Sequence, residues 1–561
     1  MSKFDWDDGD VTFGGEEDPR GDLQFQTLPG LLANAVQEFG SLVAVVEGLD
    51  DAGGATRLTY KELGLRVDEA AAGFLAQGVT RGQRVGIWAP NCLEWMVAAL
   101  GITSIGGVLV PLNTRFKGSE AAYILRNAGI ELLVTVEGFL GFDYPAMLIG
   151  EDLGDLSQIV LLKGKATTIP DGIRVQAFSQ LLASGSEVEA SKVTSARQAV
   201  LPTDLGDLVF TSGTTGHPKG VATTHAQTLR TFATWASIVG LRSGDRYQIV
   251  NPFFHTFGYK AGLLASLMTG ATMYPEPVFD VAIVRSHLAA EQITVLPGPP
   301  TLFQSLLADP DADAELSSLR LVVTGAALVP VELVEALRDR LGVETVLTAY
   351  GLTEATGVVT MCRAGDPPEL IAATSGRAIP EVEVRIVDLS GNEVERGVPG
   401  ELIVRGYNVM QGYFANEAAT AETIDAEGFL HTGDIATMDA GGNIVITDRL
   451  KDMYVVGGFN AYPAEIEASL RQHAAISQVA VLGVPDERMG EVGCAYVVTA
   501  DEPTAALATT LLQFASDRMA NYKVPRYLVF VDSLPLNASG KVLKRELRLQ
   551  FAAGNDPVFT K

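Results

Sequence analysis

The segment FTSGTTGHPKG, residues 210–220, combines a flexible backbone with several hydroxyls and one lysine, and seven of its eleven residues are Gly, Thr or Ser. Glycine lets the backbone approach a ligand closely and present N–H groups to anionic oxygen. A Walker A loop needs a glycine directly before its lysine, whereas Pro218 precedes Lys219 here. The segment therefore predicts a phosphate-binding loop of another kind, between an expected strand (204–210) and an expected helix (225–237). A plain flexible surface loop is the alternative.

Two further segments carry polar side chains that suit a nucleotide. TAYGLTE, residues 348–354, closes an expected parallel strand, and ligands of open α/β sheets collect at the carboxyl ends of strands. Glu354 could bind Mg²⁺ on a nucleotide and Thr353 could donate to a phosphate; a turn with a solvated glutamate is the alternative. In HTGDI, Asp434 is expected just before a strand, where its carboxylate could accept from two ribose hydroxyls or simply form a turn.

Two segments near the C-terminal end combine cations with glycine. DRLKDMYVVGG, residues 448–458, has the composition of a hinge that absorbs large dihedral changes. PLNASGKVLKREL, residues 535–547, places Lys541 on a glycine-bearing turn, which alone is ordinary for a surface lysine. Neither segment specifies a function by itself, so the combination of all five segments is the informative property.

Composition excludes several classes of partner and compartment. The net charge of −27 argues against nucleic acid and against an anionic membrane surface, because both are bound mainly through Lys and Arg. The three cysteines form no CxxC pair, so no disulfide framework or zinc site is expected and a reducing cytoplasm fits. The uncharged run 95–114 contains glycines and a proline, which favours a buried helix and strand over an integral membrane segment. The acidic N-terminus lacks the apolar stretch of a signal peptide.

The alternation of apolar segments predicts an α/β fold. From Arg84 onward the apolar patterns predict the order β-α-β-α-β, and the same alternation of strands and helices is expected between Ile293 and Gly351. This indicates two doubly wound α/β subdomains. Short alternating strands after Thr374 predict a small antiparallel β subdomain.

The length of 561 residues is too great for one core. We assign residues 1–25 to an acidic disordered tail, because they are rich in charge and glycine. Residues 26–449 are expected to form a large N-terminal region, and residues 450–561 a small α+β domain.

The five segments together resemble one family, the AMP-forming adenylate enzymes, which include acyl-CoA synthetases, luciferases and the adenylation domains of peptide synthetases. The resemblance runs from Leu58 to Lys541, with the segments in the family's order. It implies an ATP-dependent acyl-CoA ligase, an acid–thiol ligase that uses ATP, Mg²⁺ and coenzyme A. A carboxylate reacts with ATP to give acyl-AMP and pyrophosphate, and CoA then accepts the acyl group and releases AMP.

The resemblance also assigns roles to residues that match the family's motifs. Thr211 and Glu354 are implied as the pair associated with Mg²⁺, and Lys541 as the lysine that bridges the substrate carboxylate and the α-phosphate. Lys451 stands at the hinge about which residues 450–561 rotate as a mobile lid. The other implied ATP and CoA contacts are Ser212, Gly213, Thr214, Thr215, Gly216 and Lys219 on the phosphates; Gly325, Ala326, Ala327, Thr348, Ala349, Tyr350, Gly351 and Thr353 around the adenylate; Asp434 and Arg449 on the ribose; and Gly457 and Gly458 beside the pantetheine.

The acid is indicated by the segments around the implied acyl pocket. NPFFHTFGYKAG, residues 251–262, places His255 where the family has a histidine that lines or gates this pocket; a core histidine is the alternative. Neither this segment nor residues 295–301 offers an acidic side chain for a substrate ammonium, which disfavours an amino acid. Together with residues 346–357 and 449–465, both resemble actinobacterial acyl-CoA synthetases of sterol catabolism, in particular the HIP-CoA ligase type, which activates a bicyclic indanedione propanoate.

Other functions remain as alternatives. A medium- or long-chain fatty acid or an aryl acid is the alternative substrate. A catalytically silent nucleotide-binding protein is the alternative from another class, but Lys541, Glu354 and the glycines are all present. The lack of a GxSxG segment disfavours a serine hydrolase. A homodimer, and an acetyltransferase that modifies Lys541, are left open as partners.

Overall fold

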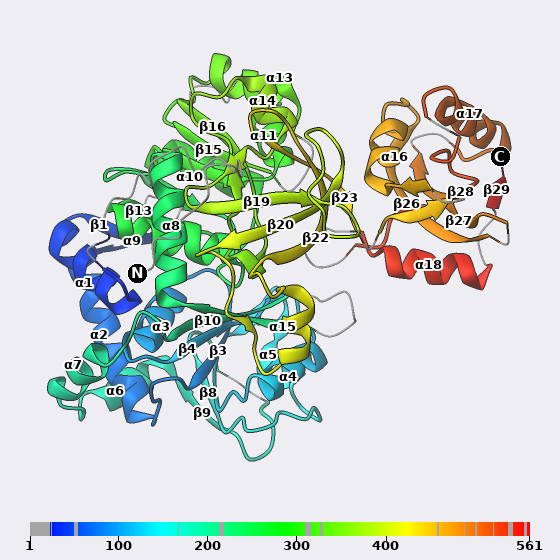
Figure 1. The fold of residues 1–561 in the computed structure, drawn as a ribbon. Coiled ribbons are helices and arrows are strands. Elements are labelled where there is room, and N and C mark those ends of the chain that lie inside the picture. The colour runs from blue at the N-terminus through cyan, green and yellow to red at the C-terminus, as the bar shows by residue number, and fades with distance from the viewer. Residues whose placement is uncertain are drawn as a thin grey trace. The chain divides into compact units, whose positions relative to one another are not determined.

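The structure is a computed structural model (Figure 1). It describes residues 23, 25–49, 54–165, 168–211, 218–308, 316–325, 329–450, 452–456, 459–486, 488–499, 502–519, 521–536, 542–554 and 558–560. The expected acidic tail lies almost entirely outside these ranges. The chain divides into two compact units, one formed by residues 1–384 with 404–430 and the other by residues 385–403 with 431–561.

The first sheet of the first unit has the strand order β21-β11-β10-β4-β3-β5-β8-β9. Its strands are β3 (Arg84–Trp88), β4 (Val108–Pro111), β5 (Leu132–Thr135), β8 (Gln158–Leu161), β9 (Arg174–Ala177), β10 (Leu205–Thr211), β11 (Lys219–Thr224) and β21 (Gly412–Tyr413). The strands from β10 to β9 are parallel. Helices α3 (Leu93–Ser104) and α4 (Gly118–Asn127) connect β3, β4 and β5, which confirms the expected β-α-β-α-β order.

Helix α2 (Tyr60–Ala76) packs against both α3 and α6 (Phe178–Gly185) beside this sheet (Figure 1). Its N-terminus has a capping box, in which Thr59 accepts from the backbone of Glu62 and the Glu62 carboxylate accepts from Thr59. A Cβ added to Gly185 would lie 2.6 Å from the backbone nitrogen of Gly73, so glycine permits the close approach of α6 to α2.

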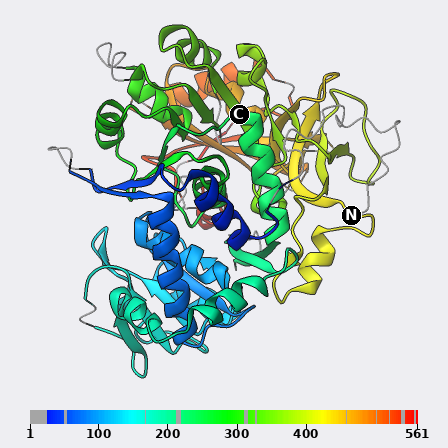
Figure 2. The same cartoon turned by 90° about the vertical axis from the view of Figure 1, so that its left-hand side faces the viewer.

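The second sheet has the strand order β18-β17-β16-β15-β14-β12-β13-β1-β2. Its strands are β1 (Val43–Glu47), β2 (Thr56–Thr59), β12 (Arg246–Ile249), β13 (Thr272–Pro275), β14 (Val295–Gly298), β15 (Leu321–Thr324), β16 (Thr345–Tyr350), β17 (Thr360–Met361) and β18 (Arg377–Ala378). The expected strands and helices between residues 293 and 351 are confirmed, with α11 (Pro300–Leu307) and α13 (Val331–Glu335) among the connections. The β1–β2 hairpin forms the far edge of the sheet (Figure 2).

The uncharged run that raised the question of a membrane span is the helix α3 followed by β4. Every residue of α3 from Trp95 to Ser104 is buried in the fold, which explains why its apolar residues surround the helix instead of forming a stripe. Within the described part of the chain, no helix combines the length and the apolar character needed to cross a membrane.

The second unit contains the C-terminal α+β fold. A sheet of β24 (Tyr454–Val456), β25 (Phe459–Ala461), β26 (Ile476–Asp486), β27 (Gly490–Thr499), β28 (Tyr527–Phe530) and β29 (Val558–Thr560) packs with α16 (Pro463–Leu470), α17 (Ala505–Ser516) and α18 (Lys544–Ala553). The preceding four-stranded sheet has the order β19-β20-β22-β23, formed by β19 (Val382–Val387), β20 (Gly400–Gly406), β22 (Leu430–Met438) and β23 (Ile444–Arg449).

One strand was not predicted, and one local prediction was wrong. The expected strand and helix around the glycine-rich segment are confirmed by β10 and α8 (His225–Val239), but β11, which pairs antiparallel with β10 between them, was not foreseen. The run KGVATT is rich in β-branched residues and provides this strand. Asp434 lies within β22 and not before a strand, because the pairing of β22 with β23 extends back to this residue.

Candidate active site

The β10–β11 hairpin places two of the expected ATP-binding residues side by side at its loop end. Thr211 and Lys219 are direct cross-strand partners, at the last residue of β10 and the first of β11. Residues 212–217, which include the expected ligands Ser212, Gly213, Thr214, Thr215 and Gly216, lie between them in the sequence and outside the described residues. Their roles therefore remain predictions.

Glu354 lies beside this end of the hairpin. It belongs to the short 3₁₀ helix η4 (Thr353–Ala355), which follows β16 at the carboxyl end of the second sheet. The hydroxyl of Thr211 donates to Glu354 Oε1 at 3.2 Å. The fold thus unites two residues, 143 positions apart, that the sequence assigned to one role.

Tyr413 is a third member of the group that the sequence analysis missed. Its hydroxyl donates to the same Glu354 oxygen at 3.1 Å, and its ring lies 4.8 Å from the ammonium of Lys219. Burial, together with the neighbouring Glu354 carboxylate, raises the pKa of Tyr413, so the hydroxyl remains a donor. No local sequence pattern marks this residue, because its place depends on the pairing of β21 with the distant strand β11.

Gly412 places Tyr413 against the hairpin. Its φ of 140° lies in the region that favours glycine, and an added Cβ would lie 2.8 Å from Thr420 Cγ2. Strand β21 then pairs with β11, with Tyr413 opposite Val221. The backbone N–H of Met410 donates to the carbonyl of Glu354 at 2.9 Å, which fixes the carboxylate-bearing residue from the same segment.

The oxygen atoms gathered here fit the Mg²⁺ ion that the sequence implied. Mg²⁺ is a hard cation that takes oxygen ligands and is commonly held by one or two carboxylates together with substrate phosphates. Glu354 supplies a half-buried carboxylate and Thr211 a hydroxyl at 3.2 Å from it. Lys219 adds positive charge near the same place.

The expected adenylate-binding residues lie at the ends of two adjacent strands. Thr324 of β15 is registered with Thr348 of β16, so Gly325 follows β15 next to Ala349. A Cβ on Gly325 would lie 3.5 Å from the carbonyl oxygen of Ala349. Tyr350 is half-buried and Gly351 is exposed, whereas Ala326 and Ala327 lie outside the described residues.

Thr348 is engaged with the fold. Its side chain is buried, and its hydroxyl lies 3.0 Å from the carbonyl oxygen of Ile371 and 2.8 Å from that of Thr374. Its carbonyl also accepts from the backbone N–H of Cys362 at 3.0 Å, so the contacts of Thr348 hold the end of β16 in place.

In the second unit, Asp434 and Arg449 are direct cross-strand partners on β22 and β23. Asp434 is buried, and its backbone N–H donates to Thr432 Oγ1 at 3.1 Å. This register unites the two expected ribose ligands at one position of a sheet. The other expected residues of this unit, Lys451, Gly457, Gly458 and Lys541, lie outside the described residues.

His255 lies in the loop between β12 and the π-helix η1 (Phe257–Leu264) and is exposed. Its Nδ1 accepts from the backbone N–H of Phe257 at 3.2 Å, so a neutral imidazole carries its proton on Nε2. The loop is held by Asn91, whose side chain donates to the carbonyl of Asn251 at 2.9 Å and accepts from Phe253 N–H at 2.7 Å. The exposure of His255 disfavours the alternative of a core histidine.

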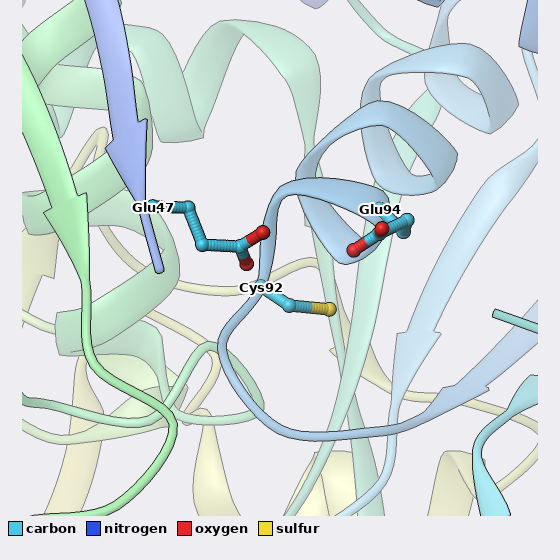
Figure 3. A group of neighbouring side chains, drawn as sticks. All are labelled: Glu47, Cys92 and Glu94. Atoms are coloured by element: carbon cyan, nitrogen blue, oxygen red, sulfur yellow. The ribbon is translucent and has the colours of Figure 1, made fainter. Parts of the chain in front are cut away.

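A second group of potential ligand atoms is formed by Glu47, Cys92 and Glu94 (Figure 3). The ammonium of Lys163 lies 3.1 Å from Glu94 and 3.7 Å from Glu47, so a protein cation already pairs with both carboxylates of this group. Burial raises the pKa of the Cys92 thiol, whereas a metal ligand must be a thiolate. The Cys92 sulfur instead accepts from the backbone of Trp95 as the N-cap of α3. These contacts favour a structural ion cluster over a metal site.

Comparison with known proteins identifies matches to both parts of the chain. Residues 32–414 match the model of the AMP-binding enzyme family, and residues 465–541 match that of the AMP-binding enzyme C-terminal domain.

The similar proteins include two bacterial ligases that share one name. A 3-[(3aS,4S,7aS)-7a-methyl-1,5-dioxo-octahydro-1H-inden-4-yl]propanoyl:CoA ligase of Rhodococcus jostii strain RHA1 is 49% identical, over 93% of this chain and 98% of that protein. The ligase of the same name from Mycobacterium tuberculosis is 45% identical over the same shares of the two chains. Among solved structures, an anthranilate CoA ligase in complex with anthranoyl-AMP aligns with a TM-score of 0.80 and 26% identity, over 96% of this chain and 100% of that one.

Proposed function

Because this chain belongs to the AMP-binding enzyme family and is an AMP-forming acid–CoA ligase, we propose that its acid is a steroid-derived bicyclic propanoate, the methyl-dioxo-octahydroindenyl propanoate of its relatives. The observation that carries the proposal is the identity of 49% and 45% to two ligases named for this acid, over nearly the whole of each chain. A fatty or aryl acid is the competing substrate, since medium-chain acyl-CoA ligases of mammals are 32–33% identical.

The residues around Glu354 support the first half-reaction. Attack of a carboxylate on the α-phosphate of ATP brings negative charges together, so neutralising groups stabilise the transition state. Mg²⁺ would supply most of that charge when bound. Thr211 and Glu354 would hold it, and Tyr413 orients the Glu354 carboxylate. Lys219 adds a positive charge at the loop end of the hairpin.

We assign the second half-reaction to the C-terminal residues 450–561. In this proposal Lys541 neutralises charge during adenylation and is withdrawn when the domain rotates about Lys451. Gly457 and Gly458 then border the CoA channel, which suits residues without side chains. Reduced, buried Cys92, Cys362 and Cys494 fit a cytoplasmic location.

The test is pyrophosphate release from ATP with the indane propanoate, straight-chain fatty acids of several lengths and aryl acids, each with and without CoA. Selectivity for the bicyclic acid, with a thioester formed only when CoA is present, is the expected result. Equal or greater kcat/KM with straight-chain acids would retain the ligase and refute the bicyclic substrate.

A further inference from the structure

A buried ion pair connects the phosphate-loop hairpin to the helix that follows His255. Lys260 Nζ lies 3.0 Å from Asp207 Oδ1, and each side chain is 1% exposed. The lysine also donates to Thr223 Oγ1 at 2.9 Å, and that hydroxyl donates to Asp207 Oδ1 at 2.8 Å. The three side chains therefore form a closed triangle of hydrogen bonds inside the first unit.

The triangle is a costly way to fill a core. Burying two charged side chains carries a large free-energy cost of desolvation, which burying two apolar side chains of the same volume does not. Replacing a buried ion pair by well-packed apolar residues therefore often leaves the protein as stable as before or more stable. Burial lowers the pKa of Lys260, while Asp207 opposes this effect. The second carboxylate oxygen of Asp207 is buried without a hydrogen-bond partner, which adds to the cost. The hydrogen bonds of the triangle are directional, so they fix the relative positions of the three side chains in a way that apolar contacts do not.

On one side the triangle is part of the hairpin that carries Thr211 and Lys219. Asp207 and Thr223 are cross-strand partners, four residues from the pair Thr211 and Lys219 on both strands. Since side chains alternate along a strand, all four project from one face of the hairpin. At the usual rise the two pairs lie about 13 Å apart.

On the other side Lys260 belongs to η1, the π-helix that begins two residues after His255. π-Helical turns are rare and occur frequently at functional sites. The start of η1 is packed tightly, because a Cβ on Gly258 would lie 2.2 Å from the carbonyl oxygen of Pro252. A displacement of Lys260 would therefore be transmitted to the loop that carries His255.

We propose that Asp207, Thr223 and Lys260 are positioning residues for acyl-adenylate formation, which fix the hairpin bearing Thr211 and Lys219 relative to the segment bearing His255. The inference rests on the proposed binding of ATP phosphates and of the acid by these two segments. It adds residues that touch neither substrate. It also gives the ion pair a role that an apolar pair at the same positions could not fulfil.

The first test replaces the charges by apolar side chains of similar size in Asp207→Leu/Lys260→Met. The control is Asp245→Leu/Arg320→Met, which removes another largely buried ion pair, with side chains 3% and 11% exposed. Thermal unfolding, ATP–pyrophosphate exchange and CoA transfer to preformed acyl-AMP are measured for both. We expect the first double variant to fold and to lose about 10- to 100-fold in exchange with unchanged CoA transfer, because a small misplacement of reacting groups has effects of this size. The control should show no such split.

The second test isolates the hydroxyl and remains decisive where the double variant does not fold. Thr223→Val keeps the shape of the side chain but removes the hydroxyl, whereas Thr223→Ser keeps the hydroxyl. We expect lower exchange for the first and near wild-type exchange for the second. Wild-type exchange in a folded Asp207→Leu/Lys260→Met protein, or in Thr223→Val, would overturn the positioning role. The assays use whichever acid the wild-type enzyme adenylates best, so failure of the bicyclic substrate is a separate result.

Discussion

The hydroxyl of Thr211 lies 3.2 Å from the carboxylate of Glu354, although the strands that lead to the two residues belong to different sheets of the fold. Thr211 ends β10 of the first sheet, and Glu354 follows β16 of the second. The contact joins the carboxyl ends of two strands, which is where open α/β sheets bind ligands. Because the carboxylate has Thr211 and Tyr413 as donors, its orientation is set before any ligand arrives.

Glu354→Gln should impair adenylation while leaving the fold intact. The amide keeps an oxygen that accepts from Thr211 and Tyr413 but loses the negative charge that suits Mg²⁺. We expect pyrophosphate release to fall by about 10²-fold or more, with a higher Mg²⁺ requirement and an unchanged thermal midpoint. A magnesium titration of the variant beside the wild type provides the measurement. Normal release at low magnesium would contradict the role of Glu354.

Tyr413→Phe and Tyr413→Leu separate the two contacts of this residue. Phenylalanine keeps the ring near Lys219 but loses the hydrogen bond to Glu354, so we expect a decrease in adenylation of about 10-fold, the size of one net hydrogen bond. Leucine also removes the cation–π contact, worth about 0.5–1 kcal/mol at a partly exposed site, and should lower activity further. Equal activity of all three proteins in pyrophosphate release would show that Tyr413 does not orient Glu354.

Lys541→Ala should lower adenylate formation by ~10²–10³ and spare CoA transfer to preformed acyl-AMP. The matched control is Lys544→Ala, since Lys544 forms an ion pair with Glu467 at 2.9 Å in the same domain. That control should leave the ratio of the two half-reactions unchanged. Lys541→Gln, which removes the charge as acetylation does, should resemble the alanine variant. An equal loss in both half-reactions would refute the assignment of Lys541.

Gly458→Trp should have the opposite effect. A large side chain beside the proposed CoA channel should block thioester formation, while adenylation with the same acid continues. Pyrophosphate release in a single turnover and thioester formation over many turnovers distinguish the two steps. If the tryptophan variant also lost single-turnover release, the channel assignment would be wrong.

His225 predicts a pH-dependent contribution to stability. Its Nδ1 accepts from the backbone N–H of Leu28 at 3.1 Å, and burial lowers its pKa to about 4 from an ordinary value near 6.5. The unfolded chain therefore binds the proton first as pH falls. The stabilisation is complete above about pH 6.5 and decreases toward pH 4, by about 3 kcal/mol in total.

His225→Asn tests this contribution, because asparagine offers an oxygen to Leu28 but does not titrate in this range. Denaturant unfolding between pH 7 and pH 4.5 should show a smaller pH dependence for the variant than for the wild type. Parallel stability curves for the two proteins would exclude His225 as the cause.

The sequence predicted the individual strands and helices of the fold better than the pairings and contacts between distant segments. The run RVGIW, β3, has the pattern of a buried parallel strand, and the motif around Glu354 was identified without structural information. The contact of Tyr413 with Glu354 depends on β21, a two-residue strand whose pairing with β11 no local pattern specifies.

The sequence around Asp207 and Lys260 contains a signal that each of these residues is buried and paired. Each is a charged residue inside an apolar run, GDLVF and GYKAGLL, and charged side chains are almost never fully buried unless they are paired. The sequence indicates that each needs a partner, but only the packing of η1 against the hairpin identifies the two as partners.

The position of β1 in the second sheet has a consequence for synthesis of the chain. Val45 pairs with Met273 of β13, so β1 cannot take its parallel place until more than two hundred further residues have left the ribosome. At typical elongation rates this takes roughly 10–50 s, during which the apolar strand stays unpaired on that side. The early chain therefore presents an edge prone to aggregation until β13 has been synthesised.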